Sequence, residues 1–391
     1  MTQLTKEVRN WASKKVPTPF HVREAAEGEV KTRFHPQNLN DTTKTSLKWV
    51  PRGNAPWRVP RPEPLVQVGR TMHTLALANA KFILSGEHFV VDGTHSVVIP
   101  APCFTTQVSL IDQSEPQLRA SCIFECESSH TMTGQELEKH QNHVLMLVKK
   151  AADLLDLDLT GTGLRCVVKS NLPPGQGAGS SSALCQAIVE ALMKHFITSD
   201  VHPNYLKWFG TQLENTWHGP VSGIDNTAIA YQRMMLYQRG QRPEPIVPGV
   251  PMFFVVGSTG PRTDKISPYA AIRRLRESRP LEYSALKLAM DDNAKELAGA
   301  IQSGHVPLVG SLMSASHQIF KQIGISTTAI ELAIQRAEML GAYGARMTGA
   351  GAGGFVIACV PVHIVDKLQM AWQEMGLRNI RTLQFDSSAV G

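Results

Sequence analysis

The segment Asn171–Leu192, NLPPGQGAGSSSALCQAIVEAL, joins a run of glycines and serines to an apolar pattern of helical spacing. That spacing predicts a helix whose buried face is made by Leu184, Ile188, Ala191 and Leu192. The first turn of a helix has unpaired N–H groups and the positive end of the helix dipole, so it attracts anions. Glycines let the backbone before the helix approach a ligand without a Cβ in the way.

The same segment lacks the Lys-Ser or Lys-Thr pair that ends a Walker A loop. We therefore expect a phosphate-binding loop of another kind. In it, Ser180, Ser181 and Ser182 supply hydroxyls for a helix cap, for phosphate oxygens or for a magnesium ion. A flexible loop with an ordinary serine cap is the alternative interpretation, because glycine-rich runs also occur without a ligand.

The composition is that of a folded protein with both α and β elements. A chain of 391 residues suffices for two domains, and 42% hydrophobic and 18% charged residues are typical of globular chains. No apolar run is long enough to span a membrane, and the first 28 residues are too polar for a secretory signal. The six scattered cysteines suit reduced thiols. We expect a soluble intracellular protein in the cytoplasm, with the mitochondrial matrix as the alternative, and no membrane partner.

Residues 1–70 differ from the rest of the chain. They hold 13 Lys and Arg against 6 Asp and Glu, a net charge of +7, together with eight prolines and three tryptophans. They show no sustained apolar period, and Pro51–Val66 is typical of an extended, proline-rich chain. We expect a basic N-terminal extension. It is either a loosely held surface tail or an arm that docks onto a protein, onto RNA or onto an import system.

Two strands are expected after Thr71, because apolar residues alternate and then run continuously on both sides of a polar break. The break contains Gly86-Glu87-His88 between two hydrophobic runs, and such polar groups are costly to bury without partners or a ligand. A turn whose polar groups are satisfied within the protein is the alternative.

Two further stretches carry groups suited to chemistry. Glu214 stands eleven residues before Asp225, and two carboxylates can divide the work of holding magnesium and of accepting a proton from a hydroxyl. For Asp225 and Asn226, which follow a serine and a glycine and precede an apolar run, a helix-capping role is the alternative. A second glycine cluster, Thr348–Gly354, leads directly into a predicted strand, which fits a close approach of the backbone to a ligand or to another segment.

Four of these stretches together resemble the GHMP kinases (galacto-, homoserine, mevalonate and phosphomevalonate kinases), and among them the mevalonate kinases most closely. KFILSGEHFVVDG (81–93) is similar to the first motif of that family. LPPGQGAGSSSAL (172–184) resembles its phosphate loop, and MTGAGAGGF (347–355) its third motif. HGPVSGIDN (218–226) is similar to a segment of the mevalonate kinases, with Glu214 at the expected offset. The resemblance covers roughly residues 71–391.

The resemblance implies an α/β (α+β) fold of two lobes. The first lobe, 71–248, would contain the phosphate loop and its helix. The second, 249–391, would be ferredoxin-like, in agreement with a strand pattern at 251–258 and helical patterns at 281–304 and 327–344. The basic extension, 1–70, would precede both lobes.

The resemblance also implies a reaction, in which ATP phosphorylates the primary alcohol of mevalonate to give 5-phosphomevalonate, with Mg²⁺ as cofactor. Asp225 would be the base, and Lys81 would lie near the transferred phosphoryl group. Glu87 and His88 would line the mevalonate pocket, and Ser181 and Glu214 would hold Mg²⁺. The ATP-binding residues would be Pro174, Gly175, Gln176, Gly177, Ala178, Gly179, Ser180, Ser181, Ser182, Gly349 and Gly351. The partners would be ATP and mevalonate, with a homodimer as a further expectation.

The chain departs from the family pattern at four places. Asn79-Ala80 replaces a usual Pro-Gly, Ala352 stands where glycine is usual, Pro220-Val221 replaces Asn-Pro, and Asp264 takes the place of a threonine. These departures leave the catalytic groups in place. Together with the basic extension, they leave open a second function, that of a weakly active or inactive kinase-fold subunit docked in a larger assembly such as a ribonucleoprotein or an organellar complex.

Overall fold

The computed structural model describes residues 73–125, 134–197, 200–219, 221–263 and 265–386, which all lie in one compact unit, Pro62–Gly391. The predicted extension, 1–70, lies outside the described residues, and so do Pro220 and Asp264. None of the helices within the described ranges is both long and apolar enough to cross a membrane.

The first sheet is built around one long strand, β2. The order is β3-β4-β2-β5-β6, and β1 pairs with β2 along the opposite edge. The β3–β4 pair is parallel and the others are antiparallel. The strands are β1 (His73–Ser85), β2 (His95–Asp112), β3 (Leu118–Phe124), β4 (Leu164–Ser170), β5 (Met235–Gln238) and β6 (Glu244–Pro245). β1 and β2 are the two strands that the sequence predicts, with the polar break between them.

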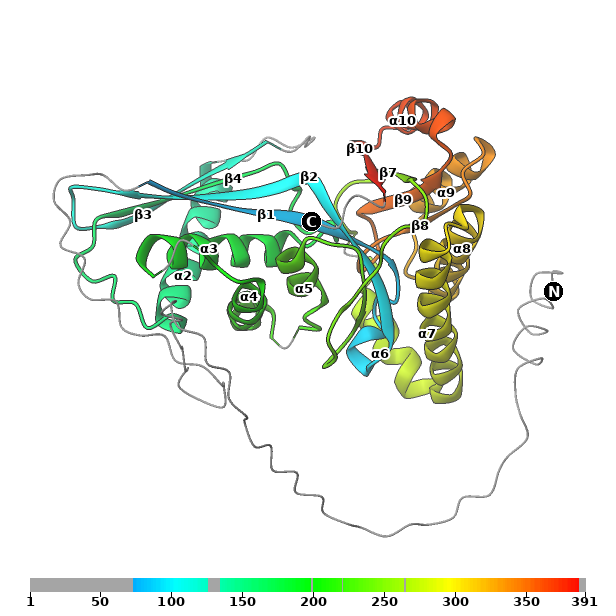
Figure 1. Cartoon of the computed structure of the whole chain (residues 1–391), viewed down its shortest axis with the longest axis horizontal. Coiled ribbons are helices and arrows are strands. Elements are labelled where there is room, and N and C mark those ends of the chain that lie inside the picture. The colour runs from blue at the N-terminus through cyan, green and yellow to red at the C-terminus, as the bar shows by residue number, and fades with distance from the viewer. Residues whose placement is uncertain (1–72, 126–133, 198–199, 220, 264, 387–391) are drawn as a thin grey trace, which may run out of the picture. The chain divides into compact units, whose positions relative to one another are not determined.

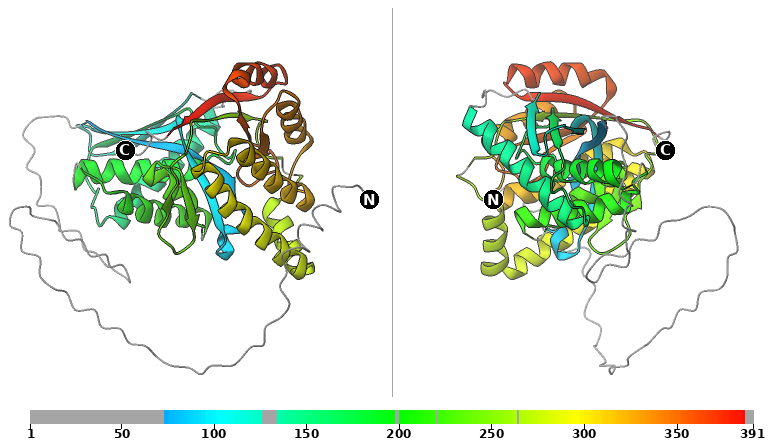
Figure 2. Two further views of the ribbon diagram at one scale, coloured as in Figure 1. Left: turned by 45° about the vertical axis from the view of Figure 1, so that its right-hand side comes forward. Right: turned by 90° about the vertical axis from the view of Figure 1, so that its left-hand side faces the viewer.

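Four helices cover one face of the sheet formed by β1–β4 (Figures 1 and 2). They are α2 (Gly134–Leu154), α3 (Ser180–Phe196), α4 (Pro203–His218) and α5 (Ile224–Tyr231). The helix predicted from the opening segment is α3, which packs against β1 and β2 and also against α2, α4 and α5. Because it is enclosed in this way, residues all around α3 are buried, whereas Leu184 of the predicted face is only partly buried.

The second sheet is antiparallel, with the order β10-β7-β9-β8. Its strands are β7 (Met252–Ser258), β8 (Gly344–Met347), β9 (Phe355–Val360) and β10 (Arg378–Phe385). In chain order this arrangement is 4-1-3-2, with helices in the first and last connections, which is the ferredoxin-like topology that was predicted. The helices are α6 (Pro268–Ser278), α7 (Pro280–Gln302), α8 (Val306–Ile323), α9 (Thr328–Met339) and α10 (Val365–Glu374), with short 3-10 turns η1 (Val90–Asp92) and η2 (Val362–Ile364).

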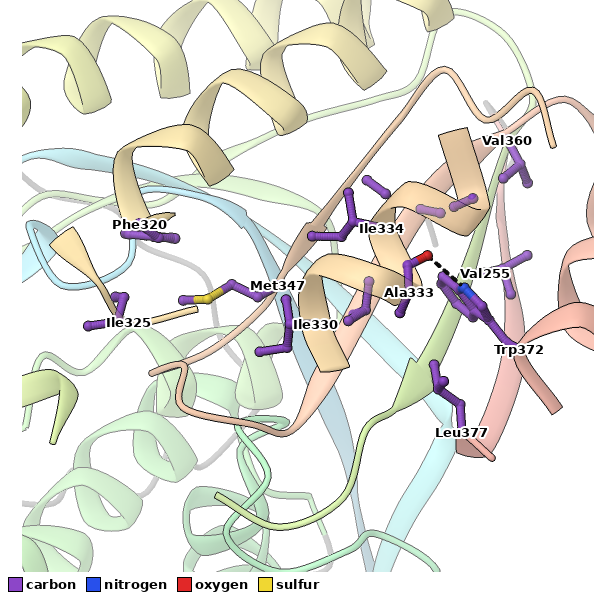
Figure 3. Close-up of a cluster of buried hydrophobic side chains, with 14 of the residues drawn as sticks. Val255, Phe320, Ile325, Ile330, Ala333, Ile334, Met347, Val360, Trp372 and Leu377 are labelled. Atoms are coloured by element: carbon purple, nitrogen blue, oxygen red, sulfur yellow. Dashed lines mark hydrogen bonds between the residues drawn. The ribbon is translucent and has the colours of Figure 1, made fainter. Parts of the chain in front are cut away.

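The core of this second part forms where α8, α9 and α10 pack on the sheet (Figure 3). Trp372 on α10 is completely buried, and its indole N–H donates to the Ala333 carbonyl of α9 at 2.9 Å. A buried tryptophan needs such a partner for its polar N–H group. This bond therefore fixes α10 against α9.

The helical pattern at 327–344 is longer than the helix that forms. α9 ends at Met339, because the chain turns through Gly341, which has a φ of 98°, and then enters β8 at Gly344. The pattern at 281–304 agrees better with the structure, where α7 spans Pro280–Gln302.

A threonine joins the two sheets at the point where their glycine-rich loops meet. The Thr348 hydroxyl, just after β8, accepts from the Ile83 N–H of β1 at 3.0 Å and donates to the Ile83 carbonyl at 3.0 Å. Thr348 is 1% exposed, so both bonds are shielded from water. Strand β1 is thereby held at the start of the second glycine cluster.

Candidate active site

The phosphate loop lies beside β1, at the start of α3 (Figure 1). The Lys81 N–H of β1 donates to the Ala178 carbonyl at 3.2 Å, and the Lys81 ammonium donates to the Gly177 carbonyl at 3.3 Å. Gly179 is the N-cap of α3, with a φ of 82°. Of the predicted ATP-binding residues in this loop, Pro174 and Gly175 are exposed, Ala178 and Gly179 are buried, and the others are intermediate or buried.

The two predicted catalytic side chains form an ion pair. Lys81 Nζ lies 2.9 Å from Asp225 Oδ1, and the side chains are 2% and 33% exposed. Asp225 stands in the first turn of α5, where the helix dipole favours its negative charge. The N-cap of that helix is Gly223, so Asp225 does not have the capping role considered above. Its carboxylate is left partly open to a ligand.

Glu214 lies deeper, on α4, and is 6% exposed. Its carboxylate oxygens accept from the Ser182 hydroxyl, at 2.9 and 2.8 Å, and from the Asn226 amide at 2.5 Å. Burial raises the pKa of Glu214 to about 7, and the nearby negative charge of Asp225 adds to this shift. The carboxyl is therefore poised to lose its proton when a cation approaches.

Ser181, the other predicted metal ligand, has a different neighbour from Ser182. Its hydroxyl lies 3.1 Å from His218 Nε2, and the His218 ring stacks on Trp217 at a centroid distance of 4.2 Å. The Trp217 ring in turn contacts His143, at 4.0 Å. A surface of aromatic rings thus adjoins the hydroxyl end of the phosphate loop.

The second glycine cluster, Thr348–Gly354, packs against the phosphate loop through backbone contacts. A Cβ placed on Gly349, whose φ is 84°, would lie 2.7 Å from the Gly177 Cα, and one on Gly354 would lie 2.4 Å from the Gln176 carbonyl oxygen. Gly351 faces another way, since its Cβ would lie 2.7 Å from the Ile325 carbonyl oxygen. Only the absence of side chains at Gly177 and Gly349 allows the two loops to meet.

Ala352, which stands where the family usually has glycine, is held in the left-handed region at φ 62° and is 1% exposed. Its N–H donates to the Ile325 carbonyl at 2.8 Å, and its carbonyl accepts from the Thr263 N–H at 2.8 Å. A left-handed alanine costs on the order of 1 to 2 kcal/mol, so these two bonds hold it against strain.

Glu87, predicted to line the substrate pocket, is 4% exposed and bonded to protein through both oxygens. Oε2 accepts from Arg346 Nη2 at 2.6 Å and Oε1 accepts from the Gly349 N–H at 3.2 Å. Burial raises the pKa of the Glu87 carboxyl, and the charge of Arg346 opposes that rise. In this structure the carboxylate is directed at the second glycine loop.

His88 has a φ of 66°, and its Nε2 lies 2.8 Å from the Ala350 carbonyl oxygen. Burial lowers the pKa of His88 to about 4, so the ring is neutral at pH 7. Because a carbonyl oxygen can only accept, Nε2 carries the proton and Nδ1 is left as an acceptor. The ring lies against Tyr269 and Phe320, with ring centroids 5.9 and 5.7 Å away.

Sequence reasoning assigned no role to Arg262. Its Cα lies 3.0 Å from where a Cβ on Gly353 would stand, and its charge contributes to the lowered pKa of His88. Its Nε is buried and has no hydrogen-bond partner among the described residues. A cation with an unused donor beside His88 suits an anionic group of a ligand. Arg262 precedes the departure at Asp264 by two residues in the sequence, which could have drawn attention to it.

The donor set around Glu214 fits magnesium. Hydroxyl and carboxylate oxygens are the ligands that Mg²⁺ prefers, and a cation would relieve the repulsion between Glu214 and Asp225. Across the described residues no group of three or more His, Cys, Asp or Glu side chains gathers as a metal site. A Mg²⁺ site does not require such a group, because the ion commonly takes one or two protein oxygens and completes its shell with phosphate oxygens and water.

Comparison with known families places these features in context. A model of the GHMP kinases N terminal domain matches residues 146–233, which contain the phosphate loop, Glu214 and Asp225. A model of the GHMP kinases C terminal domain matches residues 297–376, which contain the second glycine cluster. The chain contains both GHMP kinase domains. Both lobes are thus represented, and the fold predicted from the four motifs is confirmed.

Relatives of the chain include two mevalonate kinases. The mevalonate kinase of Thermococcus gammatolerans is 29% identical over 303 residues, which cover 74% of this chain and 90% of the relative. The mevalonate kinase of Pyrococcus furiosus is 27% identical, with the same coverage.

Solved structures show the same fold. The L. major mevalonate kinase in complex with R-mevalonate matches with a TM-score of 0.72 at 24% identity, over 84% of this chain and 100% of that one. The Lactococcus lactis galactokinase complexed with galactose matches with a TM-score of 0.61 at 16% identity, over 80% and 92%. The fold alone therefore does not distinguish a mevalonate kinase from a galactokinase.

Proposed function

We propose that this protein transfers the γ-phosphoryl group of ATP to the primary alcohol of mevalonate. The observation that carries the proposal is the pair of Lys81 on β1 and Asp225 on α5, where an ammonium and a carboxylate lie 2.9 Å apart beside the phosphate loop. Phosphoryl transfer depends mainly on positioning and on the neutralisation of charge, and this arrangement supplies both.

Each group has one task in the proposed reaction. The phosphate loop and the first turn of α3 hold the triphosphate. Asp225 accepts the proton of the alcohol as the alcohol oxygen bonds to the γ-phosphorus. The bond from the γ-phosphorus to the bridging oxygen breaks, and ADP leaves with that oxygen. Lys81 offsets the negative charge around the transferred group. Mg²⁺, held through Glu214 and Ser181, would neutralise the phosphate oxygens.

The acceptor is inferred from the surroundings of His88. The neutral ring offers Nδ1 to a hydroxyl, and Arg262 offers a cation to a carboxylate. Mevalonate carries both groups, whereas galactose lacks a carboxylate. The relatives named as mevalonate kinases support the same choice.

The experiment is an ADP-release assay with mevalonate, galactose, homoserine and phosphomevalonate as acceptors, in the presence of Mg²⁺. We expect turnover with mevalonate, and we expect Arg262→Met to raise the KM for mevalonate by about ten-fold, the effect of losing a charged hydrogen bond, with the KM for ATP little changed. Greater turnover with any other acceptor, or ADP release that is independent of mevalonate, would overturn the proposal.

A further inference from the structure

Glu87 of the first motif contacts the second glycine loop, and Glu87 is itself held by Arg346 of β8. The guanidinium Nη2 bonds to Glu87 Oε2 at 2.6 Å, and its Nε donates to the Met347 carbonyl at 2.8 Å. Arg346 is completely buried. These two bonds fix the fork of the arginine in one orientation, because its donors are rigidly spaced.

The other Glu87 oxygen acts on the loop. Oε1 accepts from the Gly349 N–H. The backbone of Gly349 packs against Gly177 of the phosphate loop, since a Cβ on Gly349 would lie 2.7 Å from the Gly177 Cα. A shift of Gly349 would therefore change the backbone contact that supports Gly177. The contacts run from Arg346 through Glu87 and Gly349 to the backbone that surrounds the phosphates.

Stability alone is a weak reason for such a buried pair. Removing two charges from water often costs as much as their attraction returns, and apolar residues of similar volume do as well or better. Arg346 Nη1 is moreover buried and finds no hydrogen-bond partner in the described part of the chain, which adds to the cost. The guanidinium also lies over the Phe320 ring, at 5.2 Å.

We propose that Arg346 is a positioning residue for nucleotide binding, which orients the Glu87 carboxylate so that it holds Gly349 against the phosphate loop. This inference rests on the proposed function only in that a nucleotide occupies the loop. It does not depend on the acceptor, and so it is tested with MgADP alone.

The first measurement compares Arg346→Met with Arg346→Lys. The methionine variant leaves the buried Glu87 carboxylate without its nearest cation, so we expect loss of thermal stability and a Kd for MgADP about ten-fold higher or more. The lysine variant keeps the charge and should recover part of both. Lys321→Met is the matched control, because Lys321 is 56% exposed and its ion pair with Glu331 lies on the same lobe.

The second measurement separates positioning from stability. Glu87→Gln/Arg346→Met and Glu87→Met/Arg346→Met both remove the unpaired charge, so both should regain the melting temperature that Arg346→Met loses. Only the glutamine retains an oxygen that accepts from Gly349. We expect the Kd for MgADP to be about ten-fold higher in the methionine double variant than in the glutamine one.

The pH dependence provides a separate readout. Among the described residues, four ionisable side chains lie near the Glu87–Arg346 pair. They are Lys81 on β1, His317 on α8, and His88 and Arg262 in loops. In Arg346→Met, Glu87 loses the charge that opposes its raised pKa, so the folded state retains a proton that the unfolded state releases. The stability of the variant should then fall, relative to wild type, as the pH rises above about 4.5.

Two results would overturn the inference. One is wild-type affinity for MgADP in Arg346→Met and in Glu87→Met/Arg346→Met. The other is an affinity that follows the melting temperature across the whole series, which would make the pair a purely structural one. Failure of mevalonate as acceptor would leave these MgADP measurements unaffected, so the two proposals fail separately.

Discussion

Asp225 is the residue on which the chemistry depends most directly, because it is the partly exposed carboxylate beside Lys81. Asp225→Asn keeps the shape of the side chain and an oxygen for the Lys81 ammonium but removes the basic group. We expect turnover to fall by a factor of about 10² or more, with the Kd for MgADP nearly unchanged. Steady-state kinetics and nucleotide titration check this, with Asp366→Asn on α10 as the control. Near-normal turnover would remove Asp225 from the mechanism.

The serines next to Glu214 allow a sharper test of the metal site. We take Ser181 as the magnesium ligand and Ser182 as the group that orients the carboxylate. The Ser182 hydrogen bond lowers the pKa of Glu214, which burial has raised to about 7. Since the protonated carboxyl binds cations poorly, the Mg²⁺ concentration for half-maximal rate should fall as the pH rises through about 7.

Ser181→Ala should raise that Mg²⁺ requirement at every pH and leave the midpoint of the pH dependence in place. Ser182→Ala should instead move the midpoint upward, because it removes a hydrogen bond that favours the charged carboxylate. Magnesium titrations at several pH values distinguish the two variants. The assignment is wrong if both behave like the wild-type protein, or if the two effects are exchanged.

What sequence reasoning missed at this scale was long-range pairing. The glycine and serine motifs have local patterns that can be read from the chain, and they predicted Lys81 and Asp225, which the structure brings together. Glu87 and Arg346 are separated by 259 positions in the sequence, and the residues around either one do not predict that the two side chains pair. Asn226, whose side-chain amide donates to Glu214, was considered only for a helix-capping role.

Among the elements, the contact between the two glycine loops is the most sensitive to substitution. In Gly349→Ala the new Cβ would lie 2.7 Å from the Gly177 Cα, and the residue has a φ of 84° that an L side chain rarely adopts. We expect a loss of about 1 to 2 kcal/mol of stability and weaker MgADP binding. Calorimetry and nucleotide titration measure both.

Gly299 in α7 provides the opposite case for the same substitution. Apart from its chain neighbours and the backbone of its own helix, no atom of the described residues lies within 4 Å of where its Cβ would stand, and the residue is exposed. Gly299→Ala should therefore stabilise the protein by about 0.5 to 1 kcal/mol without an effect on nucleotide binding. Equal effects of the two substitutions would contradict the interpretation of the loop contact.

The elements themselves could largely be predicted, and their ends could not. The strands β1 and β2 and the helix α7 agree with the apolar periods that predicted them. α9 ends earlier than its pattern because Gly341 turns the chain toward β8. α3 has no single buried face, since helices enclose it on the sides that the sheet does not cover. The apolar period of one segment does not predict which other elements will pack against it.

For the whole molecule, a deletion tests the role of residues 1–70, since every proposed site residue lies beyond them. Deleting 1–70 should leave a folded protein that phosphorylates mevalonate at close to the full-length rate. A kinase assay on both forms checks this. An inactive full-length protein that loses a large partner on truncation would favour the second function, that of a docked subunit. If that partner is RNA, its affinity should fall steeply with added salt.

The strand order of the second sheet has a consequence for how the protein is made. β10 pairs with β7, although α6 to α10 and two strands lie between them in the chain. During synthesis β7 emerges early, and one of its edges stays unpaired until residues 378–385 have left the ribosome. An unpaired edge is a site for wrong association. A nascent chain that stalls before β10 should therefore depend on chaperones more than the finished protein does.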